Sequence, residues 1–88
     1  MPEPLRVLIV DDEKELVAAL VERLDMRGVD AEGVHNGTEA VERVEHSSFD
    51  VVLLDVKMPG LSGYELIERL KRRRTGLRVV LLTGHGAV

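Results

Sequence analysis

The stretch Asp50-Val51-Val52-Leu53-Leu54-Asp55-Val56-Lys57-Met58-Pro59-Gly60 decides the fold of this chain. Its four consecutive apolar residues indicate a strand buried on both faces, because a half-exposed strand would alternate polar and apolar side chains. The strand ends on the carboxylate Asp55, and Pro59 and Gly60 then indicate a loop. Ligands of open α/β sheets bind at the carboxyl ends of the strands. Asp55 is therefore a candidate for chemistry rather than for packing.

The composition is that of one small domain. The 88 residues include no cysteine, which excludes disulfides and thiolate metal sites, and 44% are hydrophobic, as in ordinary globular proteins. The net charge of −4 gives no general affinity for nucleic acid or for an anionic membrane, so we expect no direct binding to either. No apolar run approaches the roughly 20 residues of a membrane span, and no signal-peptide pattern is present. We expect a single cytoplasmic domain over residues 1–88.

The rest of the chain repeats a β-then-α pattern. An apolar strand is expected over Leu5 to Val10, followed by a helix with Asp12 as N-cap and Gly28 at its end. The remaining expected elements are a weak, polar strand at Val29 to Val34, a helix at Thr38 to His46, a helix at Gly63 to Arg74, and a strand at Val79 to Leu82. The basic run at the end of the last helix is most simply explained by the helix dipole, which favours cations at a helix C-terminus.

This order of elements predicts a parallel sheet with right-handed crossovers. The weak second strand belongs at an edge, which favours a flavodoxin-like α/β fold with strand order 2-1-3-4 and helices on both faces. In that order the tips of the first and third strands meet. Asp11, Asp12 and Asp55 should then lie together.

Three converging carboxylates repel one another, so such a cluster persists mainly when a cation is present. Oxygen donors without cysteine suit Mg²⁺. An Asp in this setting can also attack phosphorus as a nucleophile, while the metal neutralises the charge of the transferred group. A single Asp would more often be a cap or a strand end. Three of them at adjacent strand tips, with Thr83 at the next tip, favour a functional site.

Three motifs resemble the receiver domain of bacterial two-component response regulators, with the family's spacing over all 88 residues: Val10-Asp11-Asp12-Glu13, Leu54-Asp55-Val56-Lys57-Met58-Pro59-Gly60-Leu61-Ser62-Gly63, and Leu82-Thr83-Gly84. The resemblance implies that Asp55 accepts a phosphoryl group from the phosphohistidine of a sensor histidine kinase. It also implies a regulatory module that switches an output domain or a partner protein, rather than a turnover enzyme.

The resemblance further implies a role for each matching residue. Asp12 would bind Mg²⁺ directly, Asp11 would help through the ion or a bound water, and the Lys57 backbone carbonyl would complete the protein ligands. The Thr83 hydroxyl would contact the phosphoryl group, and the Gly84 amide would donate to one of its oxygens.

The family continues through a fourth helix, a fifth strand and a fifth helix, so we expect a receiver truncated after its fourth strand. The family's fifth-strand Lys would be absent, which leaves open a receiver-like interaction module that is not efficiently phosphorylated. A phosphohydrolase is disfavoured, because that class places a second acid two residues after the nucleophile, where this chain has Lys57. An uncovered, apolar fourth strand also predicts a homodimer through that strand.

Overall fold

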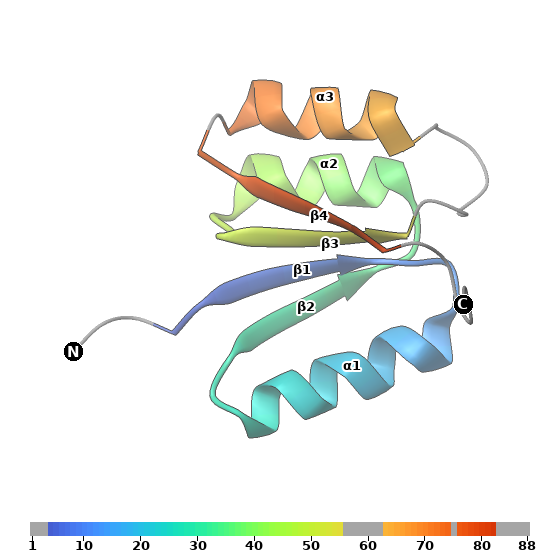
Figure 1. Ribbon diagram of the computed structural model, residues 1–88, viewed down its shortest axis with the longest axis vertical. Coiled ribbons are helices and arrows are strands. Elements are labelled where there is room, and N and C mark those ends of the chain that lie inside the picture. Colours follow the sequence, from blue (N-terminus) through green and yellow to red (C-terminus); the bar gives the residue numbers. More distant parts are fainter. Residues whose placement is uncertain (1–3, 56–62, 75, 83–88) are drawn as a thin grey trace.

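The computed structural model describes residues 4–55, 63–74 and 76–82. They form four strands and three helices in the order β1 (Arg6–Val10), α1 (Lys14–Met26), β2 (Asp30–Val34), α2 (Gly37–His46), β3 (Val51–Asp55), α3 (Gly63–Arg73) and β4 (Arg78–Leu82). Figure 1 shows α1 on one face of the sheet, with α2 and α3 next to each other on the opposite face. The predicted element order and the helices on both faces are confirmed.

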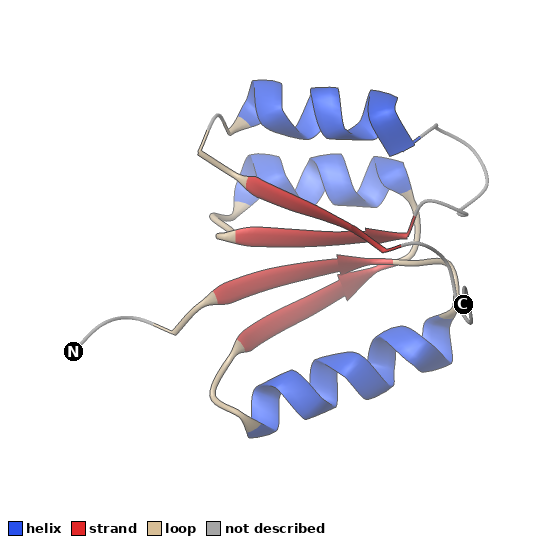
Figure 2. Ribbon diagram, in the orientation of Figure 1, coloured by secondary structure: helices blue, strands red, loops and turns tan. Residues whose placement is uncertain are grey.

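The sheet is parallel throughout, in the order β2-β1-β3-β4, as predicted. Val10 of β1 lies beside both Val34 of β2 and Leu54 of β3. Asp55 at the end of β3 lies beside Leu82 of β4. The strands therefore reach the same edge of the sheet with their carboxyl ends, as Figure 2 shows.

The core has two parts, one on each face of the sheet. Leu8 and Val10 of β1 and Val52 and Leu54 of β3 are completely buried under α2 and α3. Val7 and Ile9 of β1 pack on the other face with Val17 of α1, and the half-buried Val51 and Leu53 of β3 join them. Cover on the α1 side is thinner over β3 and β4, and Val80 remains 46% exposed there. β3 is thus buried fully on one face only, so the prediction of a strand buried on both faces was wrong for the α1 side.

Local chemistry sets the ends of α1, with one correction to the prediction. Gly28 has φ 81°, and its N–H donates to the Asp25 carbonyl while the Val29 N–H donates to the Leu24 carbonyl, which closes the helix in a Schellman motif. Asp12, however, is not the N-cap. Glu13 occupies that position without a side-chain cap bond, because Asp12 belongs to the turn that precedes it.

α1 lies very close to the edge strand β2 at Gly33. A Cβ atom at this position would overlap Cγ1 of Val17 and come within 3.5 Å of Cγ2 of Val21. The glycine that weakens the β2 pattern therefore permits the close approach of α1 to the sheet. Within the described part of the chain, no helix is long and apolar enough to cross a membrane.

Candidate functional site

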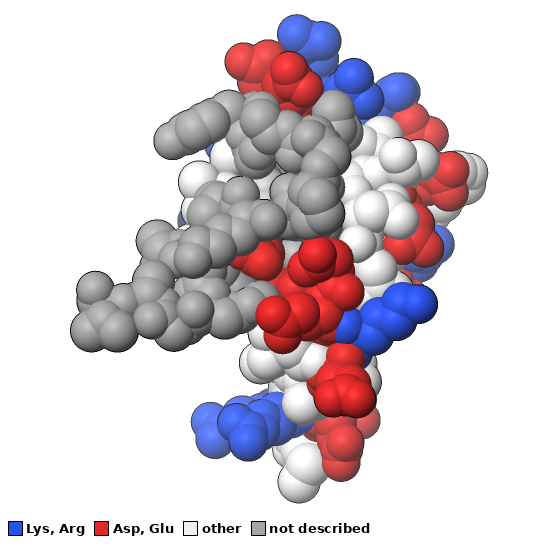
Figure 3. Space-filling model, turned by 90° about the vertical axis from the view of Figure 1, so that its right-hand side faces the viewer, with Lys and Arg blue, Asp and Glu red and all other residues white. Residues whose placement is uncertain are grey.

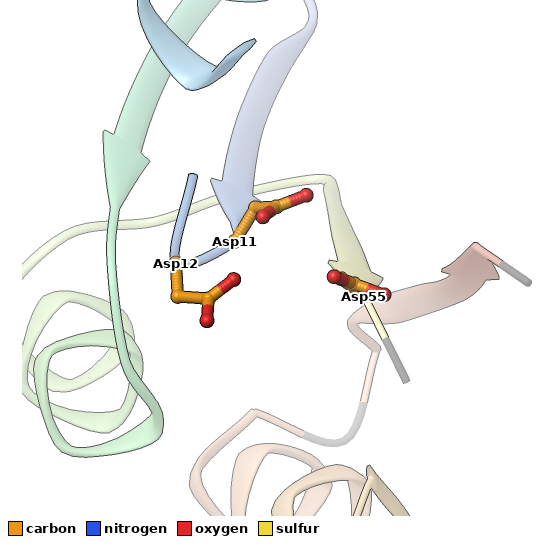
Figure 4. Close-up of side chains that lie close together, drawn as sticks. All are labelled: Asp11, Asp12 and Asp55. Atoms are coloured by element: carbon orange, nitrogen blue, oxygen red, sulfur yellow. The ribbon is translucent and has the colours of Figure 1, made fainter. Parts of the chain in front are cut away.

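The three predicted acidic residues meet at the carboxyl edge of the sheet. Asp11 directly follows β1, Asp12 begins the turn into α1, and Asp55 is the last residue of β3. One carboxylate oxygen from each lies within 4.8 Å of those from the other two. Figure 4 shows the three carboxylates around a common space between the tips of β1 and β3. The predicted convergence is confirmed.

Strand register explains why these residues converge. Val10 and Leu54 are partners in the parallel pair β1 and β3, so the next residue of each strand, Asp11 and Asp55, emerges at the same level. The last residues before the two carboxylates, Val10 and Leu54, are completely buried, which anchors Asp11 and Asp55 at the end of the packed sheet. The positions of Asp11 and Asp55 thus depend on the sheet.

Burial differs among the three carboxylates. Asp11 is 1% exposed and Asp55 is 3% exposed, whereas Asp12 is exposed to solvent. An Asp11 Oδ1 atom accepts a hydrogen bond of 2.9 Å from the Glu13 backbone N–H, which holds the turn leading into α1. A buried carboxylate is costly unless hydrogen bonds or a cation compensate its charge. No buried side-chain nitrogen or oxygen of the described residues lacks a hydrogen-bond partner.

The donor set fits a hard divalent cation. Two buried carboxylates and one exposed carboxylate supply only oxygen atoms, the ligand type that Mg²⁺ takes together with water and phosphate oxygens. On the face of the molecule shown in Figure 3, acidic side chains gather in the centre. This local negative charge favours Mg²⁺ over an anionic ligand alone.

Sequence reasoning missed one neighbour of the site, His35. Its half-buried ring places Nδ1 3.3 Å from the Asp11 backbone carbonyl oxygen, and its backbone N–H donates to Glu39 Oε1 at 3.0 Å. The strand register could have found it, because Val34 pairs with Val10 and His35 therefore emerges beside Asp11. Its distance in the sequence from the acidic motifs hid this relation.

Three other predicted site residues, Lys57, Thr83 and Gly84, lie outside the described residues. Their roles stay predictions from the resemblance. β3 and β4, which precede them, do end at the same edge of the sheet as Asp11.

Comparison with known proteins assigns the family. The response regulator receiver domain family matches residues 7–88. The transcriptional regulatory protein TcrA of Mycobacterium tuberculosis is 39% identical over 84 residues, which is 96% of this chain and 33% of that protein. The chain therefore spans about a third of the length of this relative.

Two solved structures contain the response regulator TrrA of Thermotoga maritima. In its complex with Mg²⁺ and BeF, TrrA is 33% identical, with a TM-score of 0.82 over 93% of this chain and 71% of that one. In its complex with the histidine kinase ThkA, the identity is 32% and the TM-score 0.81, over 96% of this chain and 74% of that one. On sequence and structure together, the chain belongs to the family of response regulator receiver domains.

Proposed function

We propose that this domain acts in two-component signal transduction by accepting a phosphoryl group on Asp55. The observation that carries the proposal is the cluster of Asp11, Asp12 and Asp55 at the carboxyl edge of the sheet, in a chain of the receiver family. The donor is a sensor histidine kinase, in keeping with the complex of the relative TrrA with the kinase ThkA.

In the proposed reaction, an Asp55 carboxylate oxygen forms a bond to phosphorus while the phosphorus–nitrogen bond of the phosphohistidine breaks. The electron pair of that bond stays on the imidazole nitrogen, which takes up a proton. β3 holds Asp55 in place, so little reorganisation is needed for the attack. Asp11, Asp12 and the Lys57 carbonyl would hold Mg²⁺, and the Thr83 hydroxyl and Gly84 amide would donate to the phosphoryl oxygens. When bound, Mg²⁺ neutralises charge on the phosphoryl group.

The wider role is that of a regulatory switch in the cytoplasm. The phosphorylated domain would control an output domain or a partner protein, and any phosphotransfer would be self-catalysed rather than a turnover activity. The relative TcrA is a transcriptional regulatory protein, and the match covers 33% of its length. This similarity supports the control of an output domain.

A homodimer through β4 also belongs to this proposal. β4 lies at the end of the strand order, and its Val80 side chain is 46% exposed. An edge strand with an apolar side chain on an incompletely covered face can pair with the same strand of a second copy about a two-fold axis. Leu81 packs on the α2–α3 side instead, so Val80 is the residue that would lie in the interface.

Phosphorylation is tested with acetyl phosphate and MgCl₂, read by intact mass. The wild type should gain one phosphoryl group and Asp55→Asn none, while the control Asp25→Asn, on the exposed surface of α1, should label like the wild type. Labelling that survives Asp55→Asn would contradict the assignment of the phosphoacceptor. A wild type that folds, binds Mg²⁺ and is never labelled, even by a histidine kinase, would favour the interaction module.

A further inference from the structure

The charges of this chain are distributed very unevenly. Six of its 12 Lys and Arg residues lie between residues 69 and 78, a stretch without Asp or Glu, whereas all 16 acidic residues precede it. An acidic protein therefore carries one strongly basic region. That region covers the last turns of α3, the following turn and the start of β4.

Part of this basic region lines a groove between α2 and α3. The groove has a volume of about 420 Å³ and is lined by Val41 of α2 and by Arg69, Arg72 and Arg73 of α3. The three arginines are three and four residues apart, so they share one face of α3. Val41 is half-buried between the helices and provides an apolar floor. The groove combines one apolar side chain from α2 with three cationic side chains from α3.

Structural roles account for some of these charges but not for all. Arg73 pairs with Glu45 of α2 at 2.9 Å, and Arg74 Nε donates to the Val44 carbonyl at 3.3 Å, so both fasten the end of α3 to α2. The helix dipole favours cations in the last turn, yet Arg69 precedes that turn. In the described part of the chain Arg69 makes no ion pair, and Arg72 makes only a weak one, 3.9 Å from Glu68 with both side chains more than 70% exposed.

We propose that the groove between α2 and α3 is a docking site for an acidic amphipathic helix of a partner protein. Carboxylates spaced by one helical turn on the partner would pair with Arg69 and Arg72, and an apolar side chain between them would rest on Val41. Guanidinium groups suit this role because they form two parallel hydrogen bonds with one carboxylate.

The surroundings favour a peptide over nucleic acid. Glu45 and Glu68 lie among the arginines, and the whole chain carries a net charge of −4. The closely spaced phosphates of nucleic acid would be repelled by these acids, whereas a helix can space its carboxylates to avoid them. The apolar Val41 side chain also offers no favourable contact to a phosphate.

This docking site is separate from the acidic cluster. Figure 1 shows α3 running back along the sheet, so that its last turn lies at the end where the strands begin. Asp11 and Asp55 lie at the opposite end. A partner held here would leave the phosphoryl site open, so docking does not depend on the proposed function of Asp55.

The first experiment measures binding of a synthetic helical peptide that carries Glu on one face, one turn apart, around a central Leu. Fluorescence anisotropy is recorded for the wild type, for Arg69→Gln/Arg72→Gln, and for the control Arg23→Gln/Arg27→Gln. The control removes two exposed arginines from the last turn and end of α1 and so changes the net charge equally. We expect affinity to fall about five- to tenfold in the α3 variant and to change less than about twofold in the control. Equal losses in the two variants, or no loss in either, would overturn the proposal.

The second experiment does not depend on any variant folding. Amide NMR shifts of the wild type during titration with the same peptide should change mainly in α2 and α3, and a peptide of the same composition in scrambled order should cause few changes. Shifts centred on α1 or on the acidic cluster would refute the groove as the binding site. A short DNA duplex is the competing ligand for the same arginines, so its affinity is measured as well. If the wild type binds the duplex more tightly than the peptide, and Arg69→Gln/Arg72→Gln abolishes this binding, the partner is nucleic acid and the proposal of an acidic helix is refuted.

Discussion

Replacing Asp12 by Asn should have opposite effects on stability with and without Mg²⁺. Asp12 contributes one of three carboxylates whose oxygens lie within 4.8 Å of one another, and it is the exposed one. Two unit charges about 5 Å apart repel by about 0.8 kcal/mol in water and by about 3 kcal/mol at an effective dielectric constant of 20. Asp11 and Asp12 are neighbours in the unfolded chain as well, so folding mainly adds the repulsion between Asp12 and Asp55. Without metal, Asp12→Asn should therefore raise the free energy of unfolding by about 1 kcal/mol.

In Mg²⁺ the wild type should become the more stable of the two proteins. An ion that binds only the folded state at about ten times its Kd adds roughly 1.4 kcal/mol to the free energy of unfolding. The wild type should gain this amount, and Asp12→Asn should gain little, because it lacks a charged ligand. The two stability curves should cross as Mg²⁺ is added. A change of about 1 kcal/mol corresponds to roughly 4–8 °C in Tm for a domain of this size.

Thermal and urea unfolding, followed by circular dichroism in EDTA and in MgCl₂, measure both effects. Asp12→Asn should not weaken α1, because Glu13 and not Asp12 is the N-cap. Glu22→Gln, an exposed charge removal on α1 outside the cluster, is the matched control and should respond to Mg²⁺ like the wild type. The reasoning is refuted if Asp12→Asn lowers stability in EDTA, or if its response to Mg²⁺ equals that of the wild type.

Three further substitutions test the fold around the site. Gly33→Ala should lower the free energy of unfolding in urea by about 1–3 kcal/mol, because its Cβ would overlap Val17. The control Gly76→Ala places its Cβ in open space and should have little effect. Equal effects would contradict the close approach of α1 to β2. Asn36→Ala should lower the free energy of unfolding by about 1 kcal/mol, because the Asn36 side chain accepts the Glu39 N–H at 2.8 Å, and an unchanged urea midpoint would show that this cap is not stabilising. Val80→Lys should shift the protein toward monomer in light scattering at micromolar concentration, and a dimer that persists would exclude β4 as the interface.

Several features of this protein follow from the sequence alone because they depend on neighbouring residues. The apolar run Val51 to Leu54 predicts a strand in the middle of the sheet, although only one of its faces is fully buried, and the polar β2 segment belongs at an edge. Together with the alternation of strands and helices, this favours the strand order 2-1-3-4, which the structure confirms. Parallel strands end at a common edge, so the meeting of Asp11, Asp12 and Asp55 also follows.

Other features were decided only by the packing of segments far apart in the sequence. The N-cap prediction for Asp12 was wrong because cap preference describes an isolated helix start, whereas here the buried Asp11 side chain accepts the Glu13 N–H and Glu13 becomes the N-cap. The contact of His35 with Asp11 depends on the register between β1 and β2. The groove over Val41 exists because α2 and α3 lie next to each other, an arrangement that the pattern of either helix leaves open. Local patterns determine which elements form and which residues end them, whereas distances between elements depend on how side chains from distant segments fit together.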